Sequence, residues 1–491
     1  MQEIELKFQV SEGAREAVEK AVRTASARRT HLQARYFDTG DRALAAAGMA
    51  VRLRKEGRHW MQTLKAGGPN AMARLEHNVS LGAREPTGVD VQRHADSPGA
   101  ALLAEALAPR DGAPPPLREM FRTDVWRTHR VLGVPGGAVE LAFDQGRIVA
   151  AGRELPVCEL EIELVHGSSG AVIEAARRWV VRHGVWLDVR TKAERGDRLA
   201  RDDATGQAVR AGASPWHAQM TVNEAWRAAL RDCLAQILPN ASQVASSAFT
   251  QEHVHQLRVG MRRLRSVLRF AREWVPENAP AWDEVLSKLS VRLGATRDRD
   301  VLAASLEPAL QAAGAPKVAW PAPAAADDPT TLMRATDTNL LWLDLLAAAN
   351  DDVVTTADES PPLVAYASQG LRRWHRNVVG DWKAFPNLSD EARHTVRKRA
   401  KRLRYAAEFA APLYPQKAVE RYLKRLRPLQ ESLGSFNDLC VANVTYRSLV
   451  DSDARAWFAV GWIAARREVV LAQCAKALRR FARAKPFWGK G

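Results

Sequence analysis

The sequence predicts two domains of different fold class, an α+β domain at the N-terminus and an all-helical domain after it. Up to about residue 200, apolar and polar residues mostly alternate, which is the period of β-strands. After Ser214-Pro215 the alternation stops, and long segments rich in Ala, Leu and Arg follow the 3.6-residue period of helices. The chain has 491 residues, 46% of them hydrophobic, so it can bury more than one core.

Four segments of the N-terminal half alternate like strands of an antiparallel sheet: Glu3–Val10, Val51–Arg54, Trp60–Lys65 and Cys158–Leu164. Helical spacing occurs in Ala14–Ala25 and Ala171–Val181. We therefore expect a sheet with flanking helices in this half.

Composition suggests where the domains meet. Residues 201–215 are polar and rich in turn-forming residues, which is typical of a linker. We expect the first domain to span residues 1–204, the linker 205–216 and the helical domain 217–491. A second break, Pro316–Pro329, is rich in Ala and Pro and predicts an exposed loop within the helical half.

The charge balance indicates a polyanionic partner. The formal net charge is +16 at pH 7, which suits nucleic acid, an anionic membrane surface or phosphate chains, and charge alone does not choose among them. No apolar run approaches the roughly 20 residues of a membrane span, and Met1 leads into charged alternation instead of a signal sequence. The expected compartment is the cytoplasm.

The four cysteines suggest neither a disulfide framework nor a structural zinc site. Cys158, Cys233, Cys440 and Cys474 are far apart and form no C-x-x-C pair. We expect reduced, buried thiols.

The predicted strands each have one ionic face and one apolar face. Alternate side chains of a strand share a face, so Glu3, Glu5 and Lys7 point one way, as do Arg52 with Arg54 and the acidic residues Glu159, Glu161 and Glu163. Three carboxylates on one face repel unless a partner neutralises them. Divalent metal suits the carboxylates, and phosphate suits the basic residues. A closed barrel with an ionic lumen would place both around one substrate.

A series of motifs in the first 200 residues resembles the CYTH superfamily, the triphosphate tunnel metalloenzymes. The matching segments are Glu3-x-Glu5-x-Lys7, Tyr36-Phe-Asp-Thr39, Val51-Arg-Leu-Arg-Lys55, Thr63-Leu-Lys65, Arg74-Leu-Glu76, Thr123-Asp-Val-Trp-Arg127, Phe143-Asp-Gln-Gly146, Glu159-Leu-Glu161 and Thr191-Lys192-Ala193. The resemblance implies an eight-stranded antiparallel β tunnel with flanking helices that binds a triphosphate end-on.

The same resemblance implies roles for residues of the tunnel. Phosphate oxygens would be bound by Lys7, Arg52, Arg54, Lys65, Arg127 and Lys192. One or two Mg²⁺ or Mn²⁺ ions would be held by Glu3, Glu5, Asp144, Glu159 and Glu161, and the catalytic set would be Glu3, Glu5, Lys7, Lys65 and Lys192. Two points stay open: Glu163 could replace Glu159 in the liganding pair, and Arg74, Arg122 and Arg130 are further candidates for phosphate contact.

The helical half contains an internal repeat. His255-x-x-Arg258-x-x-x-Arg262-Arg-Leu-Arg265 is matched by His394-x-x-Arg397-x-x-x-Lys401-Arg-Leu-Arg404 with identical spacing. Leu293-Gly294 with Asp298 and Asp300 follows the first copy, and Leu433-Gly434 with Asn437 and Asp438 follows the second. We therefore expect two related helical bundles.

Each copy of the repeat places its basic residues on one stripe of a helix. At 100° per residue, His255, Arg258, Arg262 and Arg265 fall together, and so do His394, Arg397, Lys401 and Arg404. A neighbouring stripe of Leu257, Met261, Leu264 and Leu268 can face a core. Like charges along one stripe repel, and a bound polyanion would relieve that repulsion.

This half resembles the CHAD domain, the conserved-histidine α-helical domain, over roughly residues 217–485. The resemblance implies two pseudo-repeated four-helix bundles that bind inorganic polyphosphate, with contacts from the eight residues of the two stripes. Each leading histidine would donate to phosphate or make a structural hydrogen bond. Nucleic acid is a weaker candidate, because single-strand binders interleave aromatic residues and the stripes offer only Tyr405.

Together these features predict a metal-dependent inorganic triphosphatase whose helical half binds polyphosphate, in the cytoplasm and associated there with polyphosphate granules. Two alternatives remain open at this stage. One is a polyphosphate-binding scaffold with little turnover. The other is a CYTH enzyme that acts on a nucleoside or thiamine triphosphate, including cyclisation of ATP.

Overall fold

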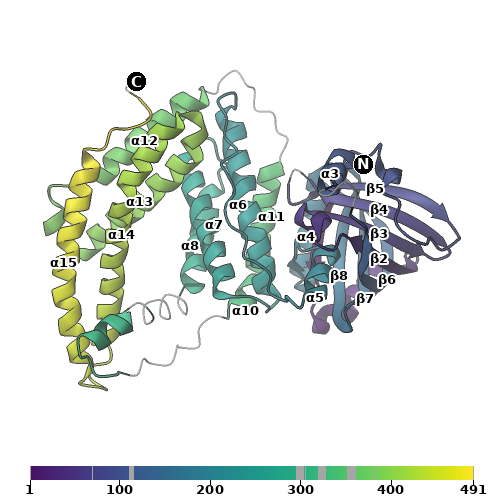
Figure 1. Ribbon diagram of the computed structural model, residues 1–491, viewed down its shortest axis with the longest axis horizontal. Coiled ribbons are helices and arrows are strands. Elements are labelled where there is room, and N and C mark those ends of the chain that lie inside the picture. The colour runs from purple at the N-terminus through teal and green to yellow at the C-terminus, as the bar shows by residue number, and fades with distance from the viewer. Residues whose placement is uncertain are drawn as a thin grey trace. The chain divides into compact units, whose positions relative to one another are not determined.

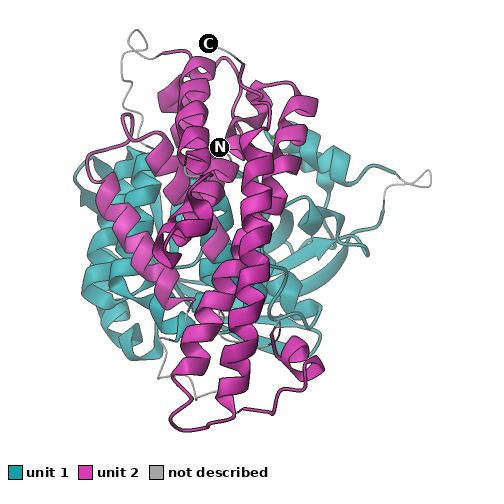
Figure 2. Cartoon of the chain, turned by 90° about the vertical axis from the view of Figure 1, so that its left-hand side faces the viewer, with its two compact units in different colours: residues 1–211, 234–257, 328–352 teal, residues 212–233, 258–327, 353–491 magenta. Residues whose placement is uncertain are grey.

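The computed structural model describes residues 2–68, 70–109, 115–294, 304, 306–318, 328–350, 361–380 and 382–489. Asp298 and Asp300, and most of the predicted Pro316–Pro329 loop, lie outside these residues. The chain forms two compact units (Figure 2). Unit 1 contains residues 1–211, 234–257 and 328–352, and unit 2 contains residues 212–233, 258–327 and 353–491.

The N-terminal half forms a closed antiparallel barrel (Figure 1). Its strands are β1 (Gln2–Gln9), β2 (Arg28–Asp38), β3 (Met49–Glu56), β4 (His59–Gly67), β5 (Ala73–Gly82), β6 (Arg118–Val134), β7 (Gly137–Ala150) and β8 (Arg153–Gly167). They run in the order β5-β4-β3-β2-β6-β7-β8-β1, and pairing of β1 with β5 closes the ring. The short β9 (Trp186–Leu187) pairs with β1 as well. The predicted eight-stranded tunnel is therefore confirmed.

The register of the strands gathers ionic side chains on the inward face. Lys7 pairs with Glu161, Asp144 pairs with Glu159, and Arg127 pairs with Asp144. Directly paired residues share a face of the sheet. The residues that alternate with them, such as Phe8 and Leu160, are fully buried on the outer, apolar face.

Helices cover the outer face of the barrel. The helix α1 (Arg15–Val22) packs on β6 and β7, and α4 (Ser169–His183) packs on β1, β7 and β8. The short helices α2 (Ala43–Ala46) and α3 (Ala100–Ala106) contribute Leu44 and Leu103 to a cluster over β3 and β4. Two 3₁₀ turns, η1 (Glu12–Ala14) and η2 (Val91–His94), complete this layer. The predicted helices at residues 14–25 and 171–181 are thus found as α1 and α4.

The helix α5 (Lys192–Ala200) packs against the inward face of the sheet. Its N-cap is Thr191, whose hydroxyl accepts a hydrogen bond from the Glu194 amide at 2.9 Å. Ala193 and Leu199 pack on an apolar cluster that contains Tyr36 and Phe121. These cluster residues share the face of Arg52 and Arg127, so α5 brings Lys192 to the ionic side of the barrel.

Two segments of the helical half belong to unit 1. They come from α6 (Val222–Ala245), α7 (Gln251–Phe270), α10 (Pro329–Arg334) and α11 (Thr336–Asn350). The buried side chains of Asn339 and Ser242 accept hydrogen bonds from the amides of Leu187 and Val189, at 2.8 and 3.0 Å. In addition, α11 packs against α4, where Arg177 pairs with Asp344. Helical residues therefore complete the packing around β9.

The rest of the helical half forms unit 2. Its further elements are α8 (Ala279–Arg292), α12 (Leu363–Val379), η4 (Phe385–Asn387), α13 (Asp390–Ala410), η5 (Ala411–Leu413), α14 (Gln416–Arg447) and α15 (Ala456–Ala482). Within the described residues, every regular element after Pro215 is helical, as predicted. His255 and His394 are each the fifth residue of their helices, α7 and α13, which agrees with the repeat. The predicted core stripe from Leu257 to Leu268 is buried.

Two further expectations can be compared with the fold. All four cysteines are free thiols; Cys233 and Cys474 are buried as expected, whereas Cys158 and Cys440 are partly exposed. Among the helices that the structure describes, none combines the length and the apolar composition needed to cross a bilayer.

Candidate functional site

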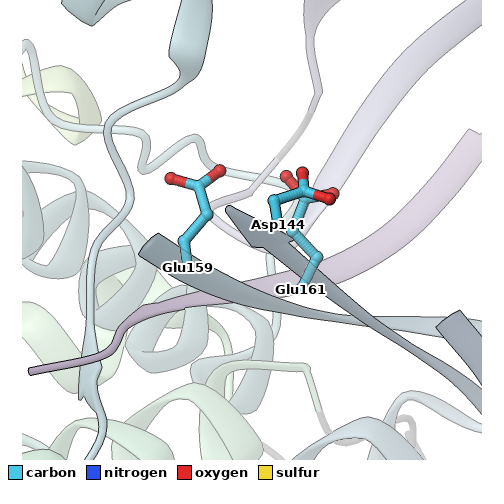
Figure 3. A group of neighbouring side chains, drawn as sticks. All are labelled: Asp144, Glu159 and Glu161. Atoms are coloured by element: carbon cyan, nitrogen blue, oxygen red, sulfur yellow. The ribbon is translucent and has the colours of Figure 1, made fainter. Parts of the chain in front are cut away.

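Three carboxylates from adjacent strands meet on the inward face of the barrel. Asp144 of β7 and Glu159 and Glu161 of β8 offer oxygen atoms that all lie within 4.8 Å of one another (Figure 3). Asp144 and Glu159 have exposed fractions of 1% and 0%. We refer to these residues as the acidic trio. Because buried carboxylates are costly without partners, the trio requires nearby cations.

Three cations balance the acidic trio. The Lys192 Nζ lies 2.6 Å from Asp144 Oδ2 and 2.9 Å from Glu161 Oε1, and it also contacts Glu159. Arg127 donates two 2.7 Å hydrogen bonds to Asp144 and also pairs with Glu161. A third cation, the buried Arg195, pairs with Glu159.

The ion pairs keep this centre charged. Burial by itself opposes each charged form, but the acidic trio outweighs it and raises the pKa of Lys192 above its usual value. Likewise, Lys192 and Arg127 hold the pKa of Glu161 well below its usual range, and the same two cations lower the pKa of Asp144. The centre therefore holds opposite charges in close contact at neutral pH.

A second acidic group lies further along the inward face and consists of Glu3, Glu5, Glu76 and Glu163. The Lys65 Nζ is 3.1 Å from Glu3 Oε2 and also pairs with Glu76. The Nε atom of Arg74 lies 2.9 Å from Glu5 Oε1. Glu163 pairs with Glu5 in the strand register. Four carboxylates thus face two paired cations.

The pKa values of the second group reflect this surplus of negative charge. Burial, together with Glu76 and Glu163, raises the pKa of Glu3 to about 8 despite the attraction of Lys65. Burial and the neighbouring Glu5 raise the pKa of Glu163 to about 7. In contrast, Lys65 and Arg52 overcome burial and lower the pKa of Glu76 to about 2. Additional positive charge would stabilise the ionised forms of Glu3 and Glu163.

The remaining predicted cations also lie on the inward face. Lys7 is buried, and burial with the nearby Arg74 lowers its pKa to about 8 despite the attraction of Glu159. Arg52 donates to the Tyr36 hydroxyl at 3.2 Å. The Nε atom of Arg54 donates to Glu56 at 2.6 Å.

The acidic trio fits a hard divalent cation. Mg²⁺ prefers oxygen ligands at about 2.1 Å, so two oxygens on one ion are at most about 4.2 Å apart. The oxygens of the trio lie within 4.8 Å of one another, so a small contraction would bring them onto one ion. The ammonium of Lys192 lies among these oxygens, which confirms that the trio accommodates positive charge.

The structure separates two groups of predicted residues that the sequence left together. Glu159 and Glu161 lie with Asp144, whereas Glu163 lies beside Glu5. Arg74 joins the second acidic group. Arg122 is exposed and pairs with Glu119, and Arg130 donates to the Ala21 carbonyl at 3.3 Å, so neither is brought to the carboxylates.

Sequence reasoning assigns no role to three residues that the structure places in the site: Glu76, Arg195 and Tyr36. Glu76 belongs to the Arg74-Leu-Glu76 segment, and its spacing of two from Arg74 placed both on one strand face. Arg195 follows Lys192 by three residues, which places the two on one side of α5. Tyr36 also lay within a matching segment.

The helical repeat brings four predicted residues into one basic group. Lys401 is half-buried near Arg397, Arg262 and Arg404, and burial with these neighbours lowers its pKa to about 7 despite Asp438. Burial and like charge thus penalise the ammonium, which an anion would stabilise.

The other four stripe residues lie outside this basic group. Arg265 donates to Asp283 Oδ1 at 2.8 Å, and His394 Nδ1 is 2.7 Å from Asn437 Oδ1. The His394 contact is one of the two alternatives expected for the leading histidines. Arg258 is half-buried in unit 2, and His255 is half-buried in unit 1.

Comparisons with known proteins identify both halves. Residues 1–196 match the CYTH domain, and residues 228–447 match the CHAD domain. An inorganic triphosphatase of Haemophilus influenzae is 29% identical over 164 residues, which is 33% of this chain and 44% of that protein. An uncharacterized protein of Mycobacterium tuberculosis is 29% identical over 443 residues, 82% of each chain. The crystal structure of the CHAD domain from the plant Ricinus communis is 28% identical, covers 57% of this chain and 98% of its own, and has a TM-score of 0.44.

Proposed function

We propose that this chain, whose N-terminal part belongs to the CYTH family and whose C-terminal part contains a CHAD domain, hydrolyses inorganic triphosphate to diphosphate and phosphate. One observation carries the proposal: buried carboxylates and buried cations meet on the inward face of a single closed barrel. Such a face suits a linear phosphate that binds with a divalent metal. The name of the Haemophilus influenzae relative supports this choice of substrate.

The cations of the barrel would bind the substrate and stabilise the products. Water adds to the terminal phosphorus and gives up a proton to solvent, the bridging P–O bond breaks, and diphosphate leaves with its electron pair. Lys7, Arg52, Arg54, Lys65, Arg127 and Lys192 would bind phosphate oxygens and stabilise the charge that develops on diphosphate. Their placement on one inward face allows several of them to contact one short chain.

The carboxylates would hold the metal, Mg²⁺ or Mn²⁺. We assign one ion to the acidic trio and favour Glu3 and Glu5 of the second group as further ligands. A bound divalent ion supplies charge neutralisation at the phosphate oxygens and a lower pKa for a coordinated water. Lys192 and Arg127 would then be available to phosphate, because the carboxylates that they contact would bind the ion instead.

The helical half would bind inorganic polyphosphate through its basic repeat. The group of Arg262, Arg397, Lys401 and Arg404 supports this, since Lys401 is half-buried beside three arginines that, together with burial, lower its pKa. A phosphate chain offers closely spaced negative charge to such a group. The arrangement would keep the protein near a long-chain phosphate while the barrel acts on short chains.

Phosphate release tests the catalytic proposal. Inorganic triphosphate, ATP, thiamine triphosphate and long-chain polyphosphate are each incubated with the full chain and Mg²⁺ or Mn²⁺, and again with chelator. We expect metal-dependent release from triphosphate in preference to the others. Glu5→Gln should abolish it, whereas Glu16→Gln, at an exposed position of α1, should not. Absence of release from every substrate, with polyphosphate still bound, would contradict the proposal in favour of a scaffold.

Polyphosphate retention tests the second part. An Arg262→Gln and Lys401→Met double variant should lose retention of long chains and keep triphosphate turnover. Arg455→Gln, an exposed arginine of unit 2 that pairs with Asp453, serves as the matched control. Unchanged retention in the double variant would refute the assignment of the basic group.

A further inference from the structure

A cavity of about 650 Å³ lies within unit 2, bordered by α7, α8, α12 and α13. Its volume falls in the range of about 300–1,000 Å³ typical of small-molecule sites. Glu277 and Asp283 are the acidic residues of its wall, and the five arginines that line it are Arg269, Arg272, Arg373, Arg399 and Arg402. We call it the arginine cavity. None of the eight stripe residues is part of its described lining, although Arg402 belongs to the second copy of the repeat and the lining residue Asp283 contacts the stripe residue Arg265.

The positive charge of the arginine cavity exceeds its negative charge. Asp283 accepts hydrogen bonds from Arg265 and Arg269, at 2.8 and 2.5 Å, so two arginines share this one carboxylate. The side chain of Arg402 is half-buried beside them. Burial, together with Arg269 and Arg265, lowers the pKa of Arg402 to about 10 despite Asp283. An anion in the cavity would remove this penalty.

Another part of the lining is apolar and aromatic. Leu268, Val275, Pro276 and Pro280 line it together with the half-buried indole of Trp374. The Trp374 ring is fixed by an edge-to-face contact with Phe270, with a centroid distance of 5.2 Å. An inorganic phosphate chain has no apolar surface to place against these groups. A ligand with a flat ring and a phosphate would satisfy both parts of the wall.

We propose that the arginine cavity binds a mononucleotide, with its phosphates at Arg402 and Arg373 and its base against Trp374. A nucleobase stacks well on an indole, and guanidinium groups bind phosphate through paired hydrogen bonds. The volume of the cavity and its single lining tryptophan suit one nucleobase and not a stretch of single-stranded nucleic acid. This site does not depend on the triphosphatase proposal, because it lies wholly in unit 2.

Calorimetric titration with ADP and with pyrophosphate tests the proposal, since only ADP carries a base. The full chain is used with Lys7→Ala and Arg52→Ala, so that the barrel does not bind the nucleotide, and with chelator. We expect ADP to bind at least about tenfold more tightly than pyrophosphate, the difference that base stacking supplies. Arg402→Gln should weaken ADP binding by about tenfold or more, as the loss of a charged hydrogen bond does. Arg455→Gln should leave both affinities unchanged.

Variants of Trp374 and the binding of long-chain polyphosphate provide further tests of the proposal. Trp374→Leu should reduce ADP affinity to that of pyrophosphate, whereas Trp374→Phe should keep most of the preference. If Arg402→Gln fails to fold by circular dichroism, Arg373→Gln replaces it. If the chain with only the Lys7→Ala and Arg52→Ala substitutions binds ADP and pyrophosphate with equal affinity, the proposal is overturned. Parallel loss of ADP and long-chain polyphosphate in Arg402→Gln would also overturn it, because the cavity would then belong to the polyphosphate site.

Discussion

Replacement of Lys192 by Met removes the cation that all three carboxylates of the acidic trio contact. The Lys192 side chain is only 11% exposed. In the variant, Asp144 and Glu161 share Arg127, and Glu159 keeps Arg195. The buried Asp144 and Glu159 and the partly exposed Glu161 then contact two guanidinium groups, with the Lys7 ammonium nearby, so about one negative charge lacks a cation in direct contact.

The size of the effect follows from that charge. Removal of one partner from a buried ion pair typically costs about 3–5 kcal/mol. For a unit of the size of unit 1, each kcal/mol lowers the melting temperature by about 2–4 °C. Lys192→Met should therefore lower the melting temperature of unit 1 by about 10 °C in the absence of metal.

Thermal unfolding in chelator and in Mn²⁺ measures this directly. Because a divalent ion bound by the trio supplies the missing charge, Mn²⁺ should restore most of the lost stability in Lys192→Met and stabilise the parent less. Lys20→Met, at an exposed position of α1, is the matched control and should melt like the parent. A variant as stable as the parent in chelator, or equal stabilisation of both by Mn²⁺, would refute the reasoning.

Three further outcomes are expected. Gln243→Ala should lower triphosphate turnover by about tenfold or more in a folded protein. Gln243→Glu should keep most of the turnover, because the new carboxylate still accepts hydrogen bonds from Arg190 and Arg198. Turnover assays test this, and circular dichroism checks that both variants fold. Polyphosphate binding should weaken as the pH rises through about 7, where Lys401 loses its proton, and Lys401→Met should flatten this dependence in filter-binding assays. Burial and His77 lower the pKa of folded His94 to about 4, so the unfolded chain takes up the proton first as the pH falls. The free energy of unfolding should therefore decrease as the pH falls from about 6.5 to about 4. Denaturant titrations should show a smaller decrease in His94→Gln.

The composition of the ionic face could be predicted because it is a local property. The period of two in β1 and β8 sets which side chains share a face before any strand is paired. Thus the spacing and the resemblance place Lys7, Glu159 and Glu161 together, and the strand register agrees. The change from strands to helices after residue 200 is predictable for the same reason, since the period of the pattern is also local.

The division of the carboxylates into two groups depends on pairing, which spacing does not contain. Asp144 lies opposite Glu159, whereas Glu163 lies opposite both Glu5 and Glu140. Only the register of three strands separates Glu163 from the acidic trio. The sequence therefore left open which two of the three β8 glutamates act together.

Residues that act across long separations were not predictable either. Gln243 accepts from Arg190 at 3.1 Å, across 53 positions of the chain, and Asn339 accepts from Leu187 across 152. Each lies in a helix where its burial pattern resembles that of ordinary core packing. No local periodicity identifies the distant residue that such a side chain contacts.

These long-range contacts give the fusion of the two halves a structural consequence. Lys192 is on α5, whose Arg198 donates to Gln243 together with Arg190, and Gln243 in turn donates to the Ala204 carbonyl at 3.0 Å. A chain that lacked residues 234–257 would leave the buried Arg190 with Asp188 alone and the Val189 amide without its hydroxyl acceptor. An unsatisfied buried group costs about 1–3 kcal/mol, and here the cost would fall beside the residues that present Lys192 to the acidic trio. The helical half is therefore part of the support of the barrel's ionic centre, in addition to any ligand that it binds.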